Sequence, residues 1–217
     1  PIHVLMLLLV WVTIFKISGA QEIAGMSLQV FVMYIILARL CDYCQGPWVT
    51  YEYMDEHIKT GRIALFVTKP LHFTPYFLSQ VSAGNIMYYL VVLFVLIAGN
   101  VTRLFGINYL FPSPLIFFLF ALSLFLAIIL GFLIYYCITL SMIWVGDVWS
   151  VWGIWDGMNG LFSGELIPLT INPTFYSIAN YLPFRHLVFT PAFIYLEKYS
   201  ITEALVQICI QFSWMVF

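Results

Sequence analysis

The sequence predicts an all-α membrane protein, and its composition and its long uncharged runs carry that prediction. Of the 217 residues, 63% are hydrophobic and 8% are charged, whereas a soluble domain carries about 25% charged residues. The mean hydropathy is +1.00. No charged residue occurs from Pro70 to Thr102 or from Leu104 to Gly146. A helix crosses a bilayer with about 20 apolar residues, and these runs are continuous, unlike the short alternating segments of a β-barrel.

Six apolar stretches predict six transmembrane helices in a single domain that covers residues 1–217. The first and last stretches are short for full spans, so we expect the natural chain to extend beyond both. An even number of spans places both termini on the same side of the membrane. The expected spans are about Ile2–Phe15, Met26–Cys44, Phe77–Ala98, Pro114–Trp144, Val148–Leu166 and Ala204–Phe217.

The main hydrophilic segment predicts a short amphipathic helix over residues 47–62, between the second and third spans. Its apolar face carries Tyr51, Met54 and Ile58, which recur at helical spacing. Acidic residues precede basic ones, as the helix macrodipole favours, and Pro47 and Gly61 mark the two ends. The pattern leaves open whether this helix binds a partner or only anchors the loop at the membrane interface.

The stretch from Gly160 to Pro191 is too broken to be one straight membrane helix and too apolar to be an ordinary solvated loop. Four prolines interrupt it: Pro168, Pro173, Pro183 and Pro191. Proline removes a backbone donor and breaks helices. Broken backbone is tolerated beside a membrane where protein covers it or where it lines a cavity. We therefore expect a re-entrant or surface-lying helical cap over residues 167–198.

The expected fifth span carries the polar residue that best fits a transport pathway. Asp156 lies near its middle, and an ionisable residue at membrane depth usually faces a bundle interior or a wet cavity. A structural role at a glycine-loosened turn is the alternative. Trp152 and Trp155 are deep enough in the same span to line a route for a flat or lipid-like substrate.

Two GxxxG pairs also lie in this stretch, Gly153 with Gly157 and Gly160 with Gly164. Small residues at this spacing let helix backbones approach closely in lipid. The pairs predict a close helix contact, either a packing seam within the monomer or a subunit interface.

Several classes of chemistry find little support in the sequence. Cys41 and Cys44 form a CxxC that no second motif completes, and we interpret them as buried structural thiols rather than a redox or metal site. No lysine follows a glycine, so the chain lacks a phosphate-binding loop for ATP. Nothing in the spacing of Ser163, Glu165 and His186 fixes a hydrolytic geometry. No basic run suggests nucleic acid.

Positive charge only weakly marks the orientation in the membrane. Half of the basic residues cluster around the hydrophilic segment, which favours its cytoplasmic placement: Arg39, Lys59, Arg62 and Lys69. The other half would then lie outside: Lys16, Arg103, Arg185 and Lys198. Charge alone leaves the orientation open.

Two motifs, together with the order of the parts, resemble a known family. Residues 58–62 (IKTGR), running into 69–71 (KPL), are similar to an I-x-S/T-G…L-x-x-P-L motif that follows a coupling helix. Residues 162–169 (FSGELIPL), followed by 182–184 (LPF) and Pro191, are similar to the F-S-G-x-x-I-P-L…L-P-F…P signature. The chain resembles the permease subunits of type-2 ATP-binding-cassette (ABC) exporters, in particular a six-span bacterial branch.

This resemblance implies a permease of the bacterial inner membrane that is not itself an enzyme. The helix at 47–62 would be a cytoplasmic coupling helix that docks on one of two separate ATPase subunits, which would bind ATP and Mg. A second permease, identical or related, would complete the pathway among membrane lipids. The segment at 167–198 would lie outside as a gate.

The patterns and the resemblance together give three candidate sets of residues and no metal ligands. The ATPase-coupling set is Glu52, Asp55, Glu56, His57, Lys59, Gly61 and Arg62. The set for the pathway or dimer seam is Trp152, Gly153, Asp156, Gly157, Gly160 and Gly164. The external-gate set is Glu165, Pro168, Pro183, Arg185 and His186, of which we expect the last two to cap the fold rather than touch substrate.

Two other classes of function remain open at this point. An ion-coupled secondary transporter would use Asp156 as its proton site and would transport without an ATPase. An intramembrane enzyme would use His186 and Glu165 and would turn over substrate in detergent without nucleotide.

Overall fold

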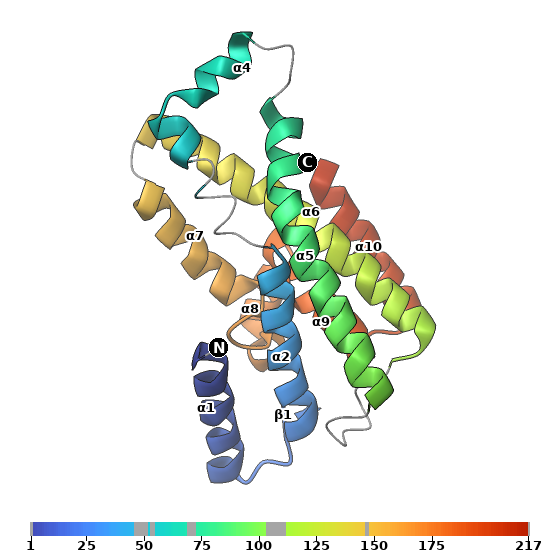
Figure 1. The fold of residues 1–217 in the computed structure, drawn as a ribbon. Helices are drawn as coiled ribbons and strands as arrows, with labels where there is room; N and C mark the ends of the chain where they lie inside the picture. Colours follow the sequence, from blue (N-terminus) through green and yellow to red (C-terminus); the bar gives the residue numbers. More distant parts are fainter. Residues whose placement is uncertain are drawn as a thin grey trace.

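The computed structural model describes residues 2–45, 52, 55–68, 73–102, 112–145 and 148–216, and most of them are helical (Figure 1). Short 3-10 helices are written η. The elements are α1 (Ile2–Ser18), β1 (Glu22–Ile23), β2 (Met26–Ser27), α2 (Leu28–Gln45), η1 (Arg62–Ala64), α4 (Leu65–Thr68), α5 (Phe73–Thr102), α6 (Pro114–Val145), α7 (Val148–Phe162), η2 (Leu169–Ile171), α8 (Pro173–Ala179), η3 (Pro183–His186), α9 (Phe189–Tyr195) and α10 (Ile201–Val216).

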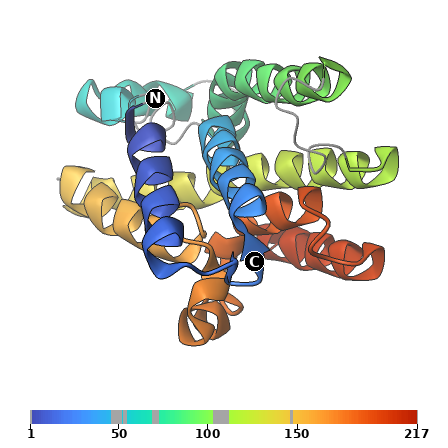
Figure 2. The ribbon, with the colours of Figure 1, turned by 90° about the horizontal axis from the view of Figure 1, so that it is seen from below.

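Helix α6 lies at the centre of the bundle. Helices α9 and α10 pack along it, and α2, α5 and α7 also contact it. Figure 2 shows α6 between α5 on one side and α9 with α10 on the other. Helix α9 contacts α2 as well, and all of its residues are buried. The short helix α9 is therefore enclosed by longer helices.

Helix α2 presents a continuous buried stripe to its neighbours. Phe31, Tyr34, Ala38 and Cys41 recur every three or four residues and are fully buried. Because lipid is as apolar as these side chains, close packing rather than removal from water stabilises such helix contacts. Cys41 and Cys44 are buried and not disulfide-bonded, which confirms their interpretation as buried thiols.

A two-stranded hairpin that the sequence analysis did not anticipate joins α1 to α2. Strands β1 and β2 pair antiparallel across Ala24 and Gly25, whose φ angles are 57° and 71°. Two successive positive φ angles are the requirement of the tight turn that matches strand twist. The hairpin returns the chain alongside α1, where Trp11 and Phe15 lie 4.6 and 5.5 Å from Phe31, measured between ring centroids.

Three helices within the described residues are long and apolar enough to cross a membrane, by length and composition. They are Leu28–Gln45, Thr74–Phe94 and Pro114–Ser141. Two shorter apolar helices, Leu5–Ser18 and Ile201–Val216, flank them in the sequence. These findings fit a predominantly helical membrane protein, and the count of six spans stays a prediction.

The segment after α7 is broken into η2, α8, η3 and α9, as its prolines predicted. Pro173 and Pro183 are the first residues of α8 and η3, where the missing backbone donor has no helical partner to lose. The side chain of Asn172 caps α8 by accepting hydrogen bonds from the backbone amides of Thr174 and Phe175. Proline therefore sets where these short helices begin.

A reciprocal capping box sets the start of α10. The Ser200 amide donates to the Glu203 carboxylate over 2.8 Å, and the Glu203 amide donates to the Ser200 hydroxyl over 3.3 Å. These two hydrogen bonds satisfy amides that have no partner inside the helix, so α10 begins at Ile201.

Gln211 on α10 joins α6 to η3 inside the bundle. Its fully buried amide accepts from the Ser123 hydroxyl at 3.0 Å and donates to the Ser123 carbonyl at 2.9 Å. It also donates to the His186 carbonyl at 3.0 Å. A single side chain thus satisfies buried polar groups on two elements.

We predict that Gln211→Leu lowers the unfolding temperature of the protein in detergent by roughly 5 °C, because it leaves buried groups without partners. Gln207→Leu is the matched control, since the buried Gln207 side-chain oxygen lacks a hydrogen-bond partner. Thermal unfolding followed by tryptophan fluorescence measures both. Equal shifts in the two variants would contradict the role assigned to Gln211.

Candidate functional site at the turn after helix α7

The site begins at the turn formed by Ser163, Gly164 and Glu165, where α7 stops. Gly164 has a φ of +81°, in the left-handed region that glycine adopts without strain. The Glu165 amide donates to the Ser163 hydroxyl at 3.2 Å. This turn ends α7 at Phe162, so the expectation of a helix to about Leu166 was wrong.

The turn is tied to both α2 and α9. The Tyr34 hydroxyl on α2 donates to the Gly164 carbonyl at 2.6 Å, and the Phe189 amide of α9 donates to the Ser163 carbonyl at 3.0 Å. The Arg39 guanidinium on α2 forms an ion pair with the Glu165 carboxylate. We call these three contacts the turn clamp. The two contacts from α2 connect residues that lie more than a hundred positions apart in the sequence.

The ion pair of the turn clamp is largely shielded from solvent. The Arg39 side chain is 18% exposed and the Glu165 side chain 11%. Asp42 on α2 and Asp156 on α7 lie close enough to interact with the charge of Glu165. Removal of either partner from a buried pair leaves an uncompensated charge, so the pair strongly constrains where the turn can sit.

A third polar contact from α2 holds the turn after η3. The buried Gln45 side chain donates to the Leu187 carbonyl at 3.0 Å, while Gln211 on α10 bonds the preceding carbonyl, that of His186. Both carbonyls follow Pro183 in a turn enclosed by the bundle. Helix α2 therefore forms hydrogen bonds to the beginning of the broken segment, at Gly164, and to its middle, at Leu187.

Arg185 and His186 of the predicted gate point into the protein and are 4% and 1% exposed. The Arg185 guanidinium donates to the Tyr199 hydroxyl at 2.7 Å and lies 5.1 Å from the centroid of the Tyr176 ring. His186 shares a 3.1 Å hydrogen bond with Thr190. Burial, together with the positive Arg185, lowers the pKa of His186 to about 3, so its ring is neutral at physiological pH. These contacts agree with a capping role.

The four glycines of the predicted seam separate into two kinds. At Gly153 and Gly157 a Cβ atom would meet nothing within 4 Å, and both residues are exposed. At Gly160 a Cβ would lie 3.1 Å from the Leu166 side chain. Gly164 lies beyond the end of α7. The second GxxxG pair therefore does not lie on one helix, although Gly164 packs closely against Tyr34 of α2 and Phe189 of α9.

Asp156 is exposed on α7, beside the open glycines. Its carboxylate lies on the outer surface of this chain, because the inward face of α7 carries other residues, and its role in a transport pathway stays a prediction. Trp155 lies on that inward face, with its ring centroid 4.6 Å from that of Phe184 and 5.5 Å from that of Tyr135. Trp152 is half-buried. Trp152 and Trp155 thus help to pack α7 against the bundle, while Asp156 is exposed on the outer side of the helix.

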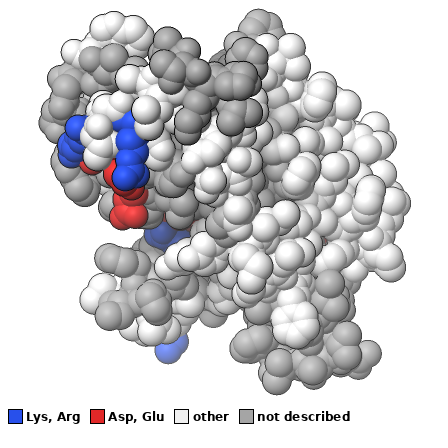
Figure 3. Space-filling view, turned by 45° about the horizontal axis from the view of Figure 1, so that its top comes forward, with Lys and Arg blue, Asp and Glu red and all other residues white. Residues whose placement is uncertain are grey.

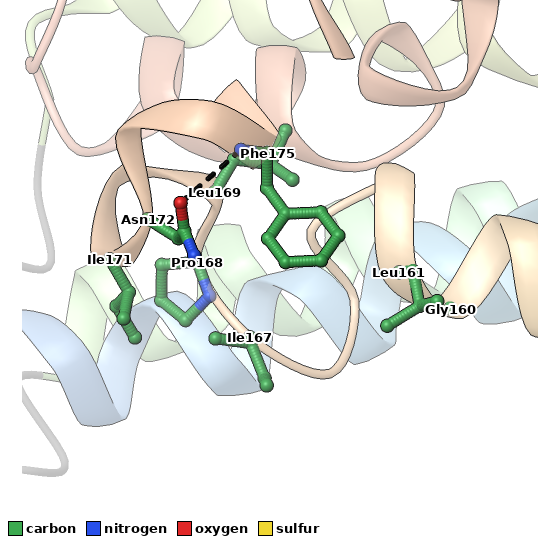
Figure 4. A pocket seen from close by; sticks show the side chains of 8 residues that line it. All are labelled: Gly160, Leu161, Ile167, Pro168, Leu169, Ile171, Asn172 and Phe175. Atoms are coloured by element: carbon green, nitrogen blue, oxygen red, sulfur yellow. Dashed lines mark hydrogen bonds between the residues drawn. The ribbon is translucent and has the colours of Figure 1, made fainter. Parts of the chain in front are cut away.

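A half-open apolar pocket of about 200 Å³ lies between the end of α7 and the start of α8 (Figure 4). We call it the α7 pocket. It is lined by Gly160, Leu161, Ile167, Pro168, Leu169, Ile171, Asn172 and Phe175. Pro168 is buried in its wall. In Figure 4 the Phe175 ring and the Leu161 and Ile167 side chains face one another across the pocket.

The described part of the predicted coupling helix is helical at residues 55–59, and a turn through Gly61, whose φ is +68°, follows it. Glu52 is exposed and helical as well. Residues 46–51, 53 and 54 lie outside the described residues, so the single amphipathic helix over 47–62 stays a prediction. Segment 55–68 lies at the end of the molecule opposite the hairpin of α1 and α2 (Figure 1).

Charged side chains of this segment are paired along the chain. Lys59 contacts Asp55 at 2.8 Å, and Arg62 contacts Glu56 at 2.7 Å. His57 instead is buried and faces the Phe66 ring at 6.4 Å, measured between centroids. Figure 3 shows blue and red side chains gathered at the upper left of a face that is otherwise mostly white or grey, with further blue side chains below them. The segment is the most charged surface among the described residues in that view.

The described contacts do not assemble Ser163, Glu165 and His186 into a catalytic group. The Glu165 carboxylate pairs with Arg39, and the His186 ring bonds Thr190. The Ser163 hydroxyl accepts from a backbone amide. The three side chains serve structural contacts instead.

Sequence reasoning missed the residues on α2 that form the clamp. In the sequence, Arg39 was interpreted only as one of the basic residues that indicate the cytoplasmic side of the membrane. A charged residue inside an expected span also predicts a buried partner. Tyr34 and Gln45 gave no comparable signal, since their partners are backbone carbonyls. Those partners become visible only when the broken segment is folded against α2.

The family model described as ABC-2 family transporter protein matches residues 2–217. The chain belongs to the ABC-2 transporter family. This ABC-2 permease is a membrane transport component, and its family implies an ABC ATPase as the partner. Neither a curated protein sequence nor a solved structure matches the chain closely enough to count as similar.

We predict that Gly164→Ala destabilises the permease strongly, by about 2–4 kcal/mol. The new Cβ would lie 2.6 Å from the Tyr34 hydroxyl and 3.2 Å from the Phe189 Cβ, at a backbone angle that alanine disfavours. Gly153→Ala, in open space on the same stretch, is the control and should leave stability unchanged or slightly higher. Denaturant unfolding in detergent compares the two. Equal stability of both variants would refute the assigned role of the turn.

Proposed function

We propose that the chain is the permease subunit of an ABC exporter, which forms a pathway with a second permease and is driven by a separate ATPase. Membership in the ABC-2 family supports the class. The exposed Asp156 beside Gly153 and Gly157 is the observation that carries the pathway. The proposal also places the six-span chain in a bacterial inner membrane.

The position of Asp156 argues against contact with lipid on this face of α7. A carboxylate near the middle of a membrane helix costs about 2.5–3.5 kcal/mol or more when it faces lipid. The same face carries two glycines with open space around them, at the spacing that permits close approach of another helix. A second permease, with a wet pathway beside it, would relieve this cost.

The segment from Glu52 to Arg62 is proposed to be the surface that contacts the ATPase. The described part of this segment lies at the end of the molecule opposite the α1–α2 hairpin (Figure 1), and its acids and bases form ion pairs along the chain. The partner subunits, two in our proposal, would bind ATP and Mg. The segment is then cytoplasmic, and residues 167–198 lie on the external side.

Helix α2 is proposed to transmit the motion of this segment. It leads in sequence from the hairpin toward the coupling segment, and its Tyr34, Arg39 and Gln45 side chains hold the broken segment. A displacement at one end of a packed helix moves the groups bonded along it. ATP hydrolysis would therefore shift the turn clamp and open the pathway beneath the broken segment.

We predict that an ABC ATPase co-purifies with the full-length permease and that Glu56→Lys and Arg62→Glu each weaken this association about tenfold, as charge reversals in an interface do. Glu22→Lys, an exposed reversal at the opposite end, is the control. Pull-down of the tagged permease, followed by ATPase assay, measures the association.

The doubly exchanged variant, Glu56→Arg with Arg62→Glu, separates recognition from local stability. It keeps an internal ion pair but reverses both charges, so it should remain defective if the ATPase recognises them. Full recovery would mean that the pair only stabilises the segment. Transport by the isolated permease under a proton gradient, with no ATPase bound, would favour the ion-coupled carrier and refute the proposal.

A further inference from the structure

Asp42 is a carboxylate of a membrane helix that the turn clamp leaves without an ion pair. It follows Arg39 by three residues on α2, so the two side chains leave the same side of that helix. Arg39 pairs with Glu165 instead. No described residue forms a salt bridge or a hydrogen bond with Asp42, which is half-buried within the apolar helix Leu28–Gln45. An acid at such a position usually pairs with another group or faces a wet cavity.

Tyr135 of α6 and Trp155 of α7 form an aromatic wall beside this carboxylate. Their ring centroids lie 5.5 Å apart, and Trp155 also packs on Phe184 with a centroid distance of 4.6 Å. Tyr135 is only 4% exposed. It interacts electrostatically with both Asp42 and Glu165, which places its hydroxyl near the two acids, and within the described chain it donates a hydrogen bond to neither. This buried hydroxyl is therefore directed at the acids and remains available to a ligand.

The acidic residues extend from Asp42 to the surface of the chain at Asp156. Asp156 is exposed on the outer side of α7 and interacts electrostatically with both Asp42 and Glu165. Arg39 is the base that interacts with Asp42 and Glu165. Three carboxylates and one guanidinium leave an excess of negative charge between α2 and α7. This excess favours a cation, which can reach the half-buried Asp42 from the side of the proposed pathway.

The surroundings of Asp42 suit an organic ammonium group better than a metal ion. Across the described parts of the chain, no three His, Cys, Asp or Glu side chains are placed to hold a metal ion. An ammonium group needs one carboxylate and gains further from the faces of aromatic rings. Tyr135 and Trp155 supply such rings. Because the site lies among apolar membrane helices, the rest of such a ligand is expected to be apolar.

We propose that Asp42 binds the ammonium group of an apolar organic cation that the exporter carries, with Tyr135 and Trp155 as its aromatic contacts. Glu165 stays paired with Arg39 and keeps its structural role in the turn clamp. Asp156 attracts the cation at the surface, from which it passes to Asp42. This inference rests on the proposed function and adds a substrate class to it.

The probe is tritiated trimethyl(6-phenylhexyl)ammonium, and the matched competitor is the neutral compound in which carbon replaces the nitrogen. Binding is measured on the full-length permease, assembled with its ATPase in nanodiscs, and empty nanodiscs give the background. We expect saturable binding of the cation and competition about tenfold weaker by the neutral compound. Asp42→Asn should weaken binding of the cation about tenfold. Asp42→Glu, which keeps the charge, and Glu22→Gln, at an exposed acid of the hairpin, should retain most of the binding.

Equal affinity for the charged and the neutral compound, or an unchanged affinity in Asp42→Asn, would overturn the inference. The unfolding temperature of each variant is measured in parallel, and if Asp42→Asn does not fold, the two compounds compared on the parent permease and on Asp42→Glu decide. ATP-driven uptake of the probe into inside-out vesicles tests the role as cargo. Absent uptake with the ATPase bound counts against the substrate class alone, whereas failure of the ATPase to co-purify counts against the proposed function.

Discussion

The turn clamp is the constraint on which the other features of this permease depend. Gly164 must take a left-handed conformation for α7 to stop at Phe162, and the carbonyl that this turn exposes is bonded by Tyr34. Arg39 balances the charge of Glu165 in a partly buried position. Because the turn is fixed, the prolines that follow it set the starts of η2, α8 and η3. The chain then places α9 between α2 and α6.

The clamp also relates the two ends of the molecule. Among the described residues of the amino-terminal half, the donors that reach the turn and the Leu187 carbonyl lie on helix α2, and the coupling segment follows α2 in sequence. The same turn ends the helix that bears Asp156. In our proposal, ATP-driven motion of α2 therefore acts on the pathway through polar contacts that lipid cannot replace.

Much of this fold was predictable because membrane helices are specified by local composition. The predicted end of the span that forms α6 lies within one residue of its observed carboxyl end. Ser200 and Glu203 have the sequence spacing of a capping box, which the structure contains. The end of α7 was misplaced, since apolar residues continue past Glu165 and several contacts that fix the turn come from the distant residues Tyr34, Arg39 and Phe189. Likewise, the partner of Arg39 depends on how a distant segment folds back, which helical periodicity does not encode.

The most direct test of this account is a charge exchange at Arg39 and Glu165, read as movement of the gate. Ile167→Cys, in a background in which the exposed Cys137 and Cys209 are serine, reports the accessibility of the segment to an impermeant maleimide. We predict that ATP with vanadate changes the labelling rate in the parent complex, that Arg39→Glu or Glu165→Arg alone abolishes this change, and that the double exchange restores it. A nucleotide response that persists in both single variants would contradict the account.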